Sequence, residues 1–346
     1  MYCNRDSTCA KRSMQPGTAG MGGRSPAGAE FQSSQGCGLF RTLIRPKWIA
    51  AALLTALGLW PAAALNAAEE IAHPFLCADY GQGKVFVVSA AGKVQWSYAL
   101  RSPQDVWLLP NGNFLFSHLQ GAIEITREKN VVWQYKTAKG NEVHTCQPLP
   151  DGRVLIGECG ACRLIEVDRM GQIRKELKLT TTTKGTHLQM RIVRKTPADS
   201  YLVSLTGEHV VGEYDGQGRA IRRIAVPGNP YEALRLPNGN TLICCGDGHK
   251  LIEVDPQDKI VWRINENDLP GHPLRFVAGI QRLPNGDTAV CNWGGHGHVG
   301  QQPQIFEVTP QLKVVWQVFD NQQFRTISHI QLLDVPGDVT KGEILR

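Results

Sequence analysis

The sequence predicts an all-β protein, a six-bladed β-propeller whose blades are four-stranded antiparallel sheets. Three observations lead to this prediction. A Leu-Pro-x-Gly turn, degraded in one copy, recurs between residues 109 and 286 at intervals of 40 or 47 residues, about the length of one propeller blade. An Ile-Glu-x-(Asp/Thr) motif recurs in the same order, and a tryptophan follows seven residues after most copies. Turn signals interrupt the chain about every ten residues, without a convincing amphipathic helix between them.

The clearest repeat spans residues 236–264 and reads as three short strands, at 241–245, 250–254 and 259–264. Asn238-Gly239 is a two-residue hairpin signal before the first of these strands. The Leu-Pro-x-Gly turn begins at Leu109, Leu149, Leu236 and Leu283, and a degraded copy begins at Thr196.

The first blade lacks an inner strand in sequence order. Six outer hairpins need six inner strands, but only five precede a Leu-Pro-x-Gly turn or its degraded form. Residues 327–333 resemble the inner strand at 279–283. We therefore predict that this C-terminal strand completes the first blade and closes the ring, which leaves no long exposed edge strand.

The residues before the propeller resemble a leader and an export signal. Residues 1–40 are rich in Gly, Ser and Gln and are predicted to be disordered, and a later methionine is an alternative start. Residues 41–67 combine basic residues, an apolar run and a small-residue end, as in a signal peptide cleaved after Ala67. An uncleaved membrane anchor is the alternative. We expect a single propeller over 68–346, periplasmic or extracellular, without membrane attachment after cleavage.

The charge balance gives no sign of a nucleic-acid partner. The whole chain carries a formal charge of +6, but residues 1–67 hold seven Lys/Arg and two Asp/Glu, so 30 basic and 29 acidic residues remain. No basic run with interleaved aromatic residues is present. We expect a monomer that binds a small molecule or a protein, and no nucleic acid.

Seven cysteines follow residue 67, an odd number for an exported protein. Most lie on strand-like runs, where we expect them to pack as small hydrophobic residues. Cys159 and Cys162 form a lone CxxC, without the second pair of a zinc ribbon or the βαβ context of a redox enzyme. We predict a loop-closing disulfide between them.

Histidines and acids gather on one predicted face of the propeller. The starts of the inner strands and the loops after the second strands should share that face, and all ten histidines follow residue 67. Histidine is a common metal ligand and an acid or base near neutral pH. The candidate ligand-binding residues are Asp79, Asp105, His118, His144, Glu232, Asn292 and His296.

Three residues of this predicted face occupy nearly equivalent positions in different blades. His187, Glu232 and His329 are predicted to converge on the propeller axis, where they are candidates for a divalent metal site. His187 and His329 are also the candidate catalytic residues. A structural role for each histidine, in binding channel water or bridging blades, remains the alternative.

The repeat Leu-Pro-Asn-Gly-Asn-x-Leu, followed by Ile-Glu-Val-Asp-x-x-x-x-Ile-Val-Trp, resembles the blades of bacterial quinoprotein-like propellers and of arylsulfotransferases. Pyrroloquinoline-quinone dehydrogenases have eight blades and tryptophan docking motifs that this chain lacks, so we do not expect that quinone to bind. The arylsulfotransferase resemblance implies a six-bladed exported enzyme with a channel histidine as nucleophile. It does not assign that role to one residue of this chain.

We expect an exported propeller that binds a small ligand or partner on its histidine-rich face, with a divalent metal as the candidate cofactor. Two alternatives remain open: an arylsulfotransferase-type enzyme with a histidine nucleophile, and a metal-dependent lyase or lactonase. A Gly-x-Ser-x-Gly elbow, a phosphate-cradling loop and an EF-hand loop are all absent from the sequence. Their absence weakens a hydrolase, kinase or calcium-loop function and leaves open a site assembled from separate blades.

Overall fold

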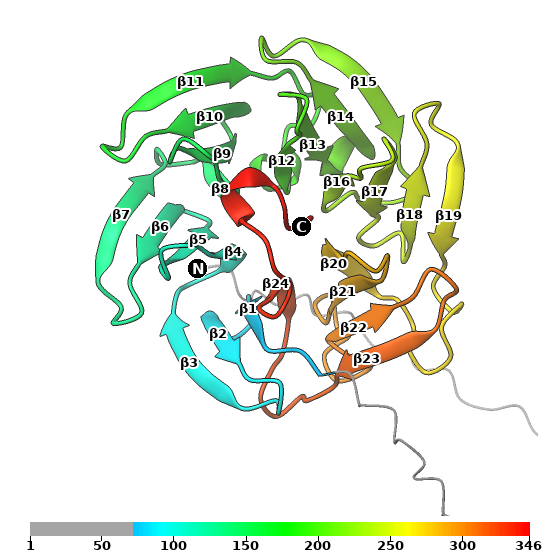
Figure 1. Ribbon diagram of the computed structural model, residues 1–346. Helices are drawn as coiled ribbons and strands as arrows, with labels where there is room; N and C mark the ends of the chain where they lie inside the picture. The colour runs from blue at the N-terminus through cyan, green and yellow to red at the C-terminus, as the bar shows by residue number, and fades with distance from the viewer. Residues whose placement is uncertain (1–71) are drawn as a thin grey trace, which may run out of the picture. The chain divides into compact units, whose positions relative to one another are not determined.

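The computed structural model describes residues 72–346, which form a six-bladed β-propeller (Figure 1). Each blade is a four-stranded antiparallel sheet, as the sequence predicts. The predicted leader (1–40) and signal peptide (41–67) lie outside the described residues. The described helices are single short 3-10 turns, none of which has the length or apolarity to cross a membrane.

The first three blades run from the closing blade through the blade that carries the CxxC sequence. Their strands, from the channel outward, are β24 (Ile327–Leu332), β1 (Phe75–Asp79), β2 (Lys84–Val88) and β3 (Val94–Ala99); β4 (Pro103–Leu108), β5 (Phe114–His118), β6 (Gly121–Ile125) and β7 (Val131–Lys136); and β8 (Glu142–Pro148), β9 (Val154–Cys159), β10 (Arg163–Val167) and β11 (Ile173–Lys178).

The other three blades follow in chain order. Their strands are β12 (Val193–Lys195), β13 (Tyr201–Leu205), β14 (Val210–Tyr214) and β15 (Ala220–Ala225); β16 (Ala233–Arg235), β17 (Thr241–Cys244), β18 (Leu251–Val254) and β19 (Ile260–Ile264); and β20 (Phe276–Arg282), β21 (Thr288–Trp293), β22 (Ile305–Val308) and β23 (Val314–Val318). The 3-10 helices are η1 (Thr186–Leu188), η2 (Thr206–Glu208) and η3 (Val339–Lys341).

Closure of the ring confirms the predicted role of the C-terminal strand. β24 pairs antiparallel with β1, with Phe75 opposite Leu332 and Cys77 opposite Ile330. All six residues of β24 are buried, because neighbouring inner strands pack on both of its faces. The ring therefore has no unpaired inner strand in the described part of the chain.

The recurrent tryptophans join neighbouring blades. The indole Nε1 of Trp96 donates to Arg127 O of the next blade at 2.8 Å, Trp133 to Asp168 O at 2.9 Å, and Trp262 to Pro310 O at 2.9 Å. Each acceptor lies in the turn after the third strand of the following blade. In these three copies the tryptophan seven residues after the third-strand motif thus makes a hydrogen bond between blades and also packs a large apolar ring there.

The recurrent glutamates bind the Leu-Pro-x-Gly turn of their own blade. Glu253 is nearly buried on β18, accepts from Asn240 Nδ2 at 2.7 Å and forms an ion pair with Arg282 of the next blade at 3.1 Å. Glu124 accepts from Asn113 Nδ2 at 2.7 Å in the same way. Both sequence motifs therefore serve the architecture.

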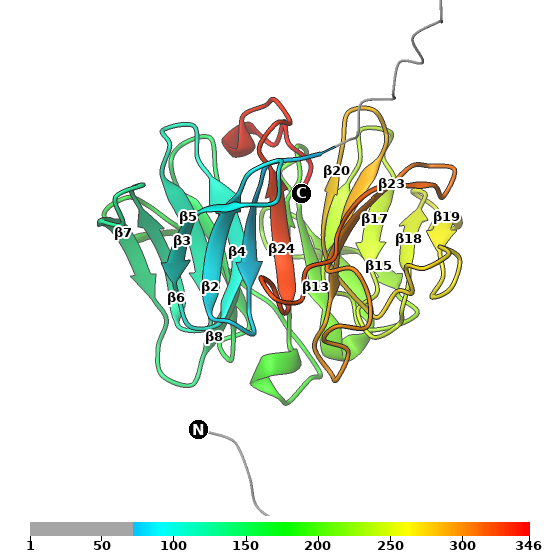
Figure 2. The ribbon, with the colours of Figure 1, turned by 90° about the horizontal axis from the view of Figure 1, so that it is seen from below.

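The two ends of the channel differ. After β24 the chain turns through η3 and runs over the centre of the ring, as the red segment of Figure 1 shows. In Figure 2 this segment lies at one face of the propeller, and the green 3-10 turns between β11 and β14 lie at the other. The candidate site lies at the second face.

Candidate metal and ligand site

A cavity of about 250 Å³ opens at the face where the inner strands begin. Its lining comes from the starts of inner strands and from the ends of second strands, the two places where the sequence predicted functional residues. The lining residues are Tyr80, Gln104, His144, His187, Arg191, Tyr231, Phe276, Trp293, His296 and Ser328.

β-Bulges shape this end of the channel. The register of β8 against β9 shifts between Val143 and Thr145, so His144 is an extra residue without a partner on β9. β4 shifts between Pro103 and Val106 and β20 between Val277 and Ile280, also near their starts. A bulge re-aims side chains at a sheet edge, which allows several blades to direct polar groups to one cavity.

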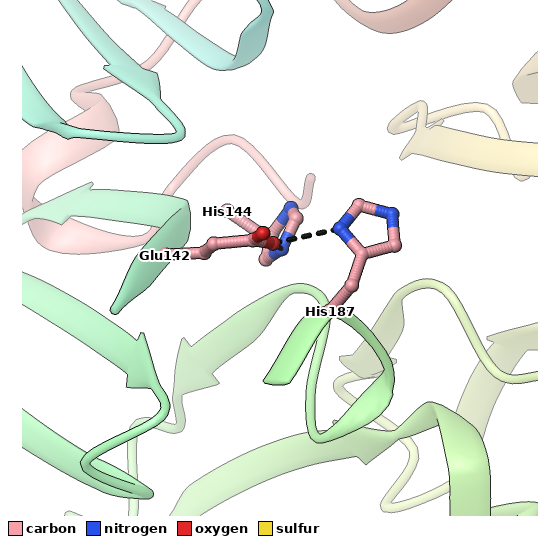
Figure 3. A group of neighbouring side chains, drawn as sticks. All are labelled: Glu142, His144 and His187. Atoms are coloured by element: carbon pink, nitrogen blue, oxygen red, sulfur yellow. Dashed lines mark hydrogen bonds and ion pairs between the residues drawn. The ribbon is translucent and has the colours of Figure 1, made fainter. Parts of the chain in front are cut away.

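Glu142, His144 and His187 form the group that could hold a metal among the described residues (Figure 3). Glu142 Oε2 lies 3.2 Å from His144 Nε2 and 2.7 Å from His187 Nδ1, and one ligand atom from each residue lies within 4.8 Å of the others. Ligands of a tetrahedral zinc at about 2.1 Å are roughly 3.3 Å apart. The group therefore fits a divalent ion after small side-chain movements.

The protonation of this group suits a metal. The hydrogen bond with His144, helped by that with His187, lowers the pKa of Glu142 to about 2 against the effect of its burial. Burial lowers the pKa of His144 to about 3, and the nearby Arg191 charge adds to this effect. The carboxylate is thus ionised and the His144 imidazole neutral at neutral pH, as metal ligation requires.

Arg191 is a buried cation without an acidic partner. Its residue is 8% exposed, and no acid in residues 72–346 lies within ion-pair distance of it. Its Nη1 donates to Met190 O at 3.3 Å and to His187 O, the backbone oxygen of a candidate ligand. Burial lowers the pKa of Arg191 below its usual value. Buried charges are normally paired, so an unpaired one beside a cavity indicates a binding role.

Aromatic rings line the cavity beside these polar groups. Phe276 and Trp293 pack edge to face with centroids 5.1 Å apart, and Tyr231 packs against Phe276 at 5.6 Å. His296 lies 5.1 Å from the Trp293 ring, and its Nδ1 lies 2.9 Å from Asp247 Oδ1. The cavity therefore combines apolar rings with a cluster of nitrogen and oxygen donors.

The predicted convergence of His187, Glu232 and His329 occurs only in part. His329 Nε2 lies 3.2 Å from Glu232 Oε2, and both residues are fully buried. His187 does not join them: it is 52% exposed on η1, in the link before β12, and pairs with Glu142 instead. A link residue lies at the rim of the channel, whereas Glu232 and His329 lie within it.

A guanidinium takes the position that a metal would need beside Glu232. Arg194 forms ion pairs with Asp105 at 2.7 Å and with Glu232 at 2.6 Å, and all three side chains are buried. Burial alone would raise the pKa of Glu232, but Arg194 and His329 hold it below its ordinary value. Asp105, Glu232 and His329 therefore belong to an internal ion-pair network with Arg194, in which Glu232 Oε1 and His329 Nδ1 have no hydrogen-bond partner within residues 72–346.

The other predicted residues have local roles. Asp79 accepts hydrogen bonds from the backbone N–H of Arg325 at 2.7 Å and of Thr326 at 3.1 Å, which fixes the chain before β24. Asn292 accepts from Arg275 N at 2.8 Å and donates to Pro273 O at 2.9 Å. His118 ends β5 outside the cavity lining, and burial lowers its pKa.

The CxxC pair is not bridged in the structure. Cys159 and Cys162 are both free and buried, and the Cys159 thiol donates to Met190 O at 3.3 Å. Cys162 has a left-handed backbone, with φ of 48°. Both thiols belong to the apolar core between two blades, so their packing role differs from the predicted disulfide.

Two functional candidates, Glu142 and Arg191, were missed by sequence reasoning. Glu142 lies two residues before His144 on one strand, a spacing that places both side chains on one face in a regular strand. That signal was present in the sequence. Arg191 carries no such signal, because nothing in the sequence shows that it lacks an acidic partner.

A larger cavity, of about 510 Å³, lies at the opposite end of the channel beneath η3. Lys195 pairs there with Glu166 at 2.9 Å and Arg235 with Glu213 at 2.5 Å, whereas Arg346 lies 3.7 Å from Asp105, which is also paired with Arg194. We place the candidate site at the smaller cavity, because unpaired charge and donor geometry identify it better than volume does.

Comparison with known proteins gives a family and a fold. The family profile described as Mal s 1 allergenic protein-like matches residues 85–311. A crystal structure from Bacteroides caccae, described as a protein of unknown function, is 31% identical, with 75% of this chain and 98% of that chain covered and a TM-score of 0.70. No curated protein matches the chain.

Two lyase structures share the propeller fold at low identity. A streptogramin B lyase structure is 10% identical, with 76% of this chain and 94% of that chain covered and a TM-score of 0.54. A catalytically inactive variant of virginiamycin B lyase from Staphylococcus aureus, solved with quinupristin, is 15% identical, with 75% and 87% covered and a TM-score of 0.51. These comparisons lend no support to the quinoprotein or arylsulfotransferase resemblance, which stays a prediction.

Proposed function

Because the chain belongs to the Mal s 1 allergenic protein-like family, with a histidine-lined cavity on its propeller axis, we propose that it binds a small ligand there through a divalent metal. Glu142, His144 and His187 are the proposed metal ligands. The observation that carries the proposal is the convergence of one ionised carboxylate and two imidazoles at the cavity. Two histidines and a glutamate are a ligand set of catalytic zinc sites, which keep one coordination position open.

The proposal predicts about one equivalent of metal per chain. The full chain, purified without a histidine tag and stripped with a chelator, is titrated with Zn²⁺ and Mn²⁺ by calorimetry. His187→Ala removes a partly exposed ligand, so it should leave the fold intact. The affinity for whichever of the two metals binds more tightly should fall at least about 10-fold, because even the loss of a residue hydrogen-bonded to a ligand has an effect of this size. Glu142→Gln should weaken it further, because it removes the anionic donor.

His272→Ala is the matched control. His272 is a surface histidine whose Nε2 lies 2.7 Å from Gln317 Oε1, outside the proposed ligand group. Its replacement should leave metal affinity unchanged. Failure of the unmodified protein to take up either metal, or equal affinity in all variants, would reject the metal site.

Lyase activity is the second candidate, favoured by His296. This histidine lines the same cavity and pairs with Asp247, an arrangement in which a carboxylate orients an imidazole to act as a general base. Low identity limits the two lyase structures to a likeness of fold. The metal-loaded protein is incubated with quinupristin, and mass spectrometry checks for a cleaved product. Binding without turnover would favour the non-catalytic proposal.

A further inference from the structure

From Arg191 and the aromatic wall we infer that the ligand of this cavity is a small planar carboxylate, with its carboxylate shared between Arg191 and the metal and its flat body against Trp293 and Phe276. The contact of the carboxylate with the metal rests on the proposed function, whereas its contact with Arg191 does not depend on a metal. The sequence analysis did not predict anion binding by Arg191, Trp293 or Phe276.

The charge of the cavity calls for an anion. Arg191 contributes one positive charge, and a divalent metal would add two, against the single negative charge of Glu142. The other acid near the lining, Asp247, is paired with His296 at 2.9 Å. The charges of Arg191 and Glu142 balance each other, so a surplus of positive charge faces the cavity once the metal is bound, and such a surplus favours a ligand of opposite sign.

The hydrogen bonds of Arg191 leave part of its guanidinium available. Both of its side-chain hydrogen bonds within residues 72–346 come from Nη1, which donates to the carbonyl oxygens of His187 and Met190. These bonds fix the guanidinium plane and leave Nε and Nη2 for an acceptor. A guanidinium with two free N–H groups matches the two oxygens of a carboxylate.

Contact with both groups favours a carboxylate over a sulfate ester. Arg191 donates to the backbone oxygen of His187, whose ring is a proposed metal ligand, so the guanidinium and the metal site are direct neighbours. One carboxylate oxygen can bind a metal while the other accepts from the arginine. The oxygens of a sulfate ester are much weaker metal ligands, so the pair of partners favours a carboxylate.

The size and walls of the cavity specify the rest of the ligand. Its volume of about 250 Å³ is below the usual range of drug-sized sites, roughly 300–1,000 Å³. Phe276, Trp293 and Tyr231 form a continuous edge-to-face cluster along it. Aromatic faces of this kind pack on a flat apolar body, so a single ring or a conjugated chain fits better than a branched aliphatic group.

The test uses the full chain and three probes: benzoate, its neutral amide benzamide, which has the same size, and acetate, which keeps the carboxylate but lacks the ring. Affinities are measured by calorimetry with and without Mn²⁺. Broadening of the benzoate ring protons in NMR spectra reports contact with the Mn²⁺-loaded site. We expect benzoate to bind at least about 10-fold more tightly than the other two probes, because each lacks one of the two recognised features.

Arg191→Gln separates the anion site from the metal site. It should weaken benzoate about 10- to 100-fold, the range for loss of hydrogen bonds to a charged group, and leave Mn²⁺ affinity no weaker. Arg191→Lys should give an intermediate value, because it keeps the charge but not the planar fork. Arg219→Gln, at an exposed turn where Arg219 pairs with Asp215, is the matched control.

A second variant covers the possibility that Arg191 variants fold poorly. Trp293→Leu removes part of the aromatic wall from a half-buried position, and should weaken benzoate without changing acetate or Mn²⁺ affinity. Metal binding without benzoate binding, or equal benzoate affinity in Arg191→Gln, would overturn the inference and leave the proposed function standing. Arg191-dependent benzoate binding by a protein that takes up neither Zn²⁺ nor Mn²⁺ would reject the metal site and keep the anion site.

Discussion

At the scale of single residues, His73 links the first residues of the propeller to its last blade. Its Nε2 lies 2.7 Å from Glu307 Oε2 and its Nδ1 lies 2.8 Å from Asp334 Oδ2. The ring also packs edge-on against Trp316, with centroids 5.0 Å apart. Burial alone would lower the pKa of His73, but the hydrogen bonds with Glu307 and Asp334 outweigh it and raise the pKa above 6.5.

This raised pKa predicts a pH-dependent contribution to stability. The stabilisation by charged His73 should be complete below its unfolded-state pKa of about 6.5, and should be lost as the pH rises through the higher folded-state pKa. We expect His73→Gln to lower the free energy of unfolding by roughly 1 kcal/mol at pH 5.5, and by less at pH 9. Urea unfolding at the two pH values measures this difference.

His298→Gln serves as the control for His73, because His298 bonds to Gln301 within its own loop. It should change stability little at either pH. An equal loss for His73→Gln at pH 5.5 and pH 9 would show that packing on Trp316, rather than charge, accounts for the contribution of His73.

The sequence predicted which residues meet in the channel better than it predicted what those residues do. Glu232 and His329 do meet, because equivalent positions of different blades face one axis. Their assignment to a metal did not anticipate Arg194, which binds Glu232 and Asp105. An arginine at an inner strand looks the same in sequence whether it neutralises channel carboxylates, as Arg194 does, or precedes the strand without an acidic partner, as Arg191 does.

At the scale of strands and turns, the repeat could be predicted from sequence because its recurring contacts join residues that are close in the chain. The glutamate of the third strand and the asparagine that follows the Leu-Pro-Asn-Gly turn lie in one hairpin, as Glu253 and Asn240 show. The site depends instead on departures from the repeat. His144 is the extra residue of a bulge and His187 lies on a 3-10 turn between blades, and neither feature follows from the blade pattern.

Close approach between two inner strands makes a prediction about Gly279 on β20. A Cβ at this position would lie 2.7 Å from Ser328 O and 2.9 Å from the His329 ring on β24. Since a backbone oxygen cannot move aside cheaply, we expect Gly279→Ala to destabilise the protein by about 1–3 kcal/mol, the usual range for overpacking. Thermal or urea unfolding measures the change.

Gly185→Ala is the matched control for Gly279→Ala. Gly185 precedes η1 with φ of −74°, and a Cβ there would meet no atom within 4 Å. Its replacement should be neutral or slightly stabilising, because it restricts the unfolded chain. Equal stability of both variants would mean that β20 and β24 can separate more easily than their contact suggests.

At the scale of the whole molecule, one strand pairing joins the two ends of the described chain. β24 and β1 are adjacent in one sheet although Ser328 and Ala78 are 250 residues apart in sequence. Closing so long a loop costs only slightly more entropy than closing a shorter one, because the cost rises with the logarithm of length. In the closed ring each inner strand pairs with the second strand of its own blade and packs between the inner strands of the two neighbouring blades.

Removal of β24 should therefore change the state of association more than removal of the segment after it. A chain ending at residue 323 loses β24 and leaves the inner edge of β1 unpaired. Exposed strand edges pair with other chains, so we expect oligomers or aggregates in size-exclusion chromatography with light scattering. A chain ending at residue 334 keeps β24 and should show the same state of association as the full chain, with a lower unfolding midpoint because η3 and its buried Val339 are lost.

A full-length variant tests the same closure without truncation. Ile330 is fully buried on β24 opposite Cys77, and Ile330→Asp would place a carboxylate in that core. We expect a loss of at least about 3 kcal/mol in the free energy of unfolding and the same tendency to associate. If both the shortened chain ending at residue 323 and Ile330→Asp stayed monomeric at the unmodified midpoint, the six blades would hold together without their closing strand, and stability would have to be assigned to the blade-to-blade contacts of the tryptophans.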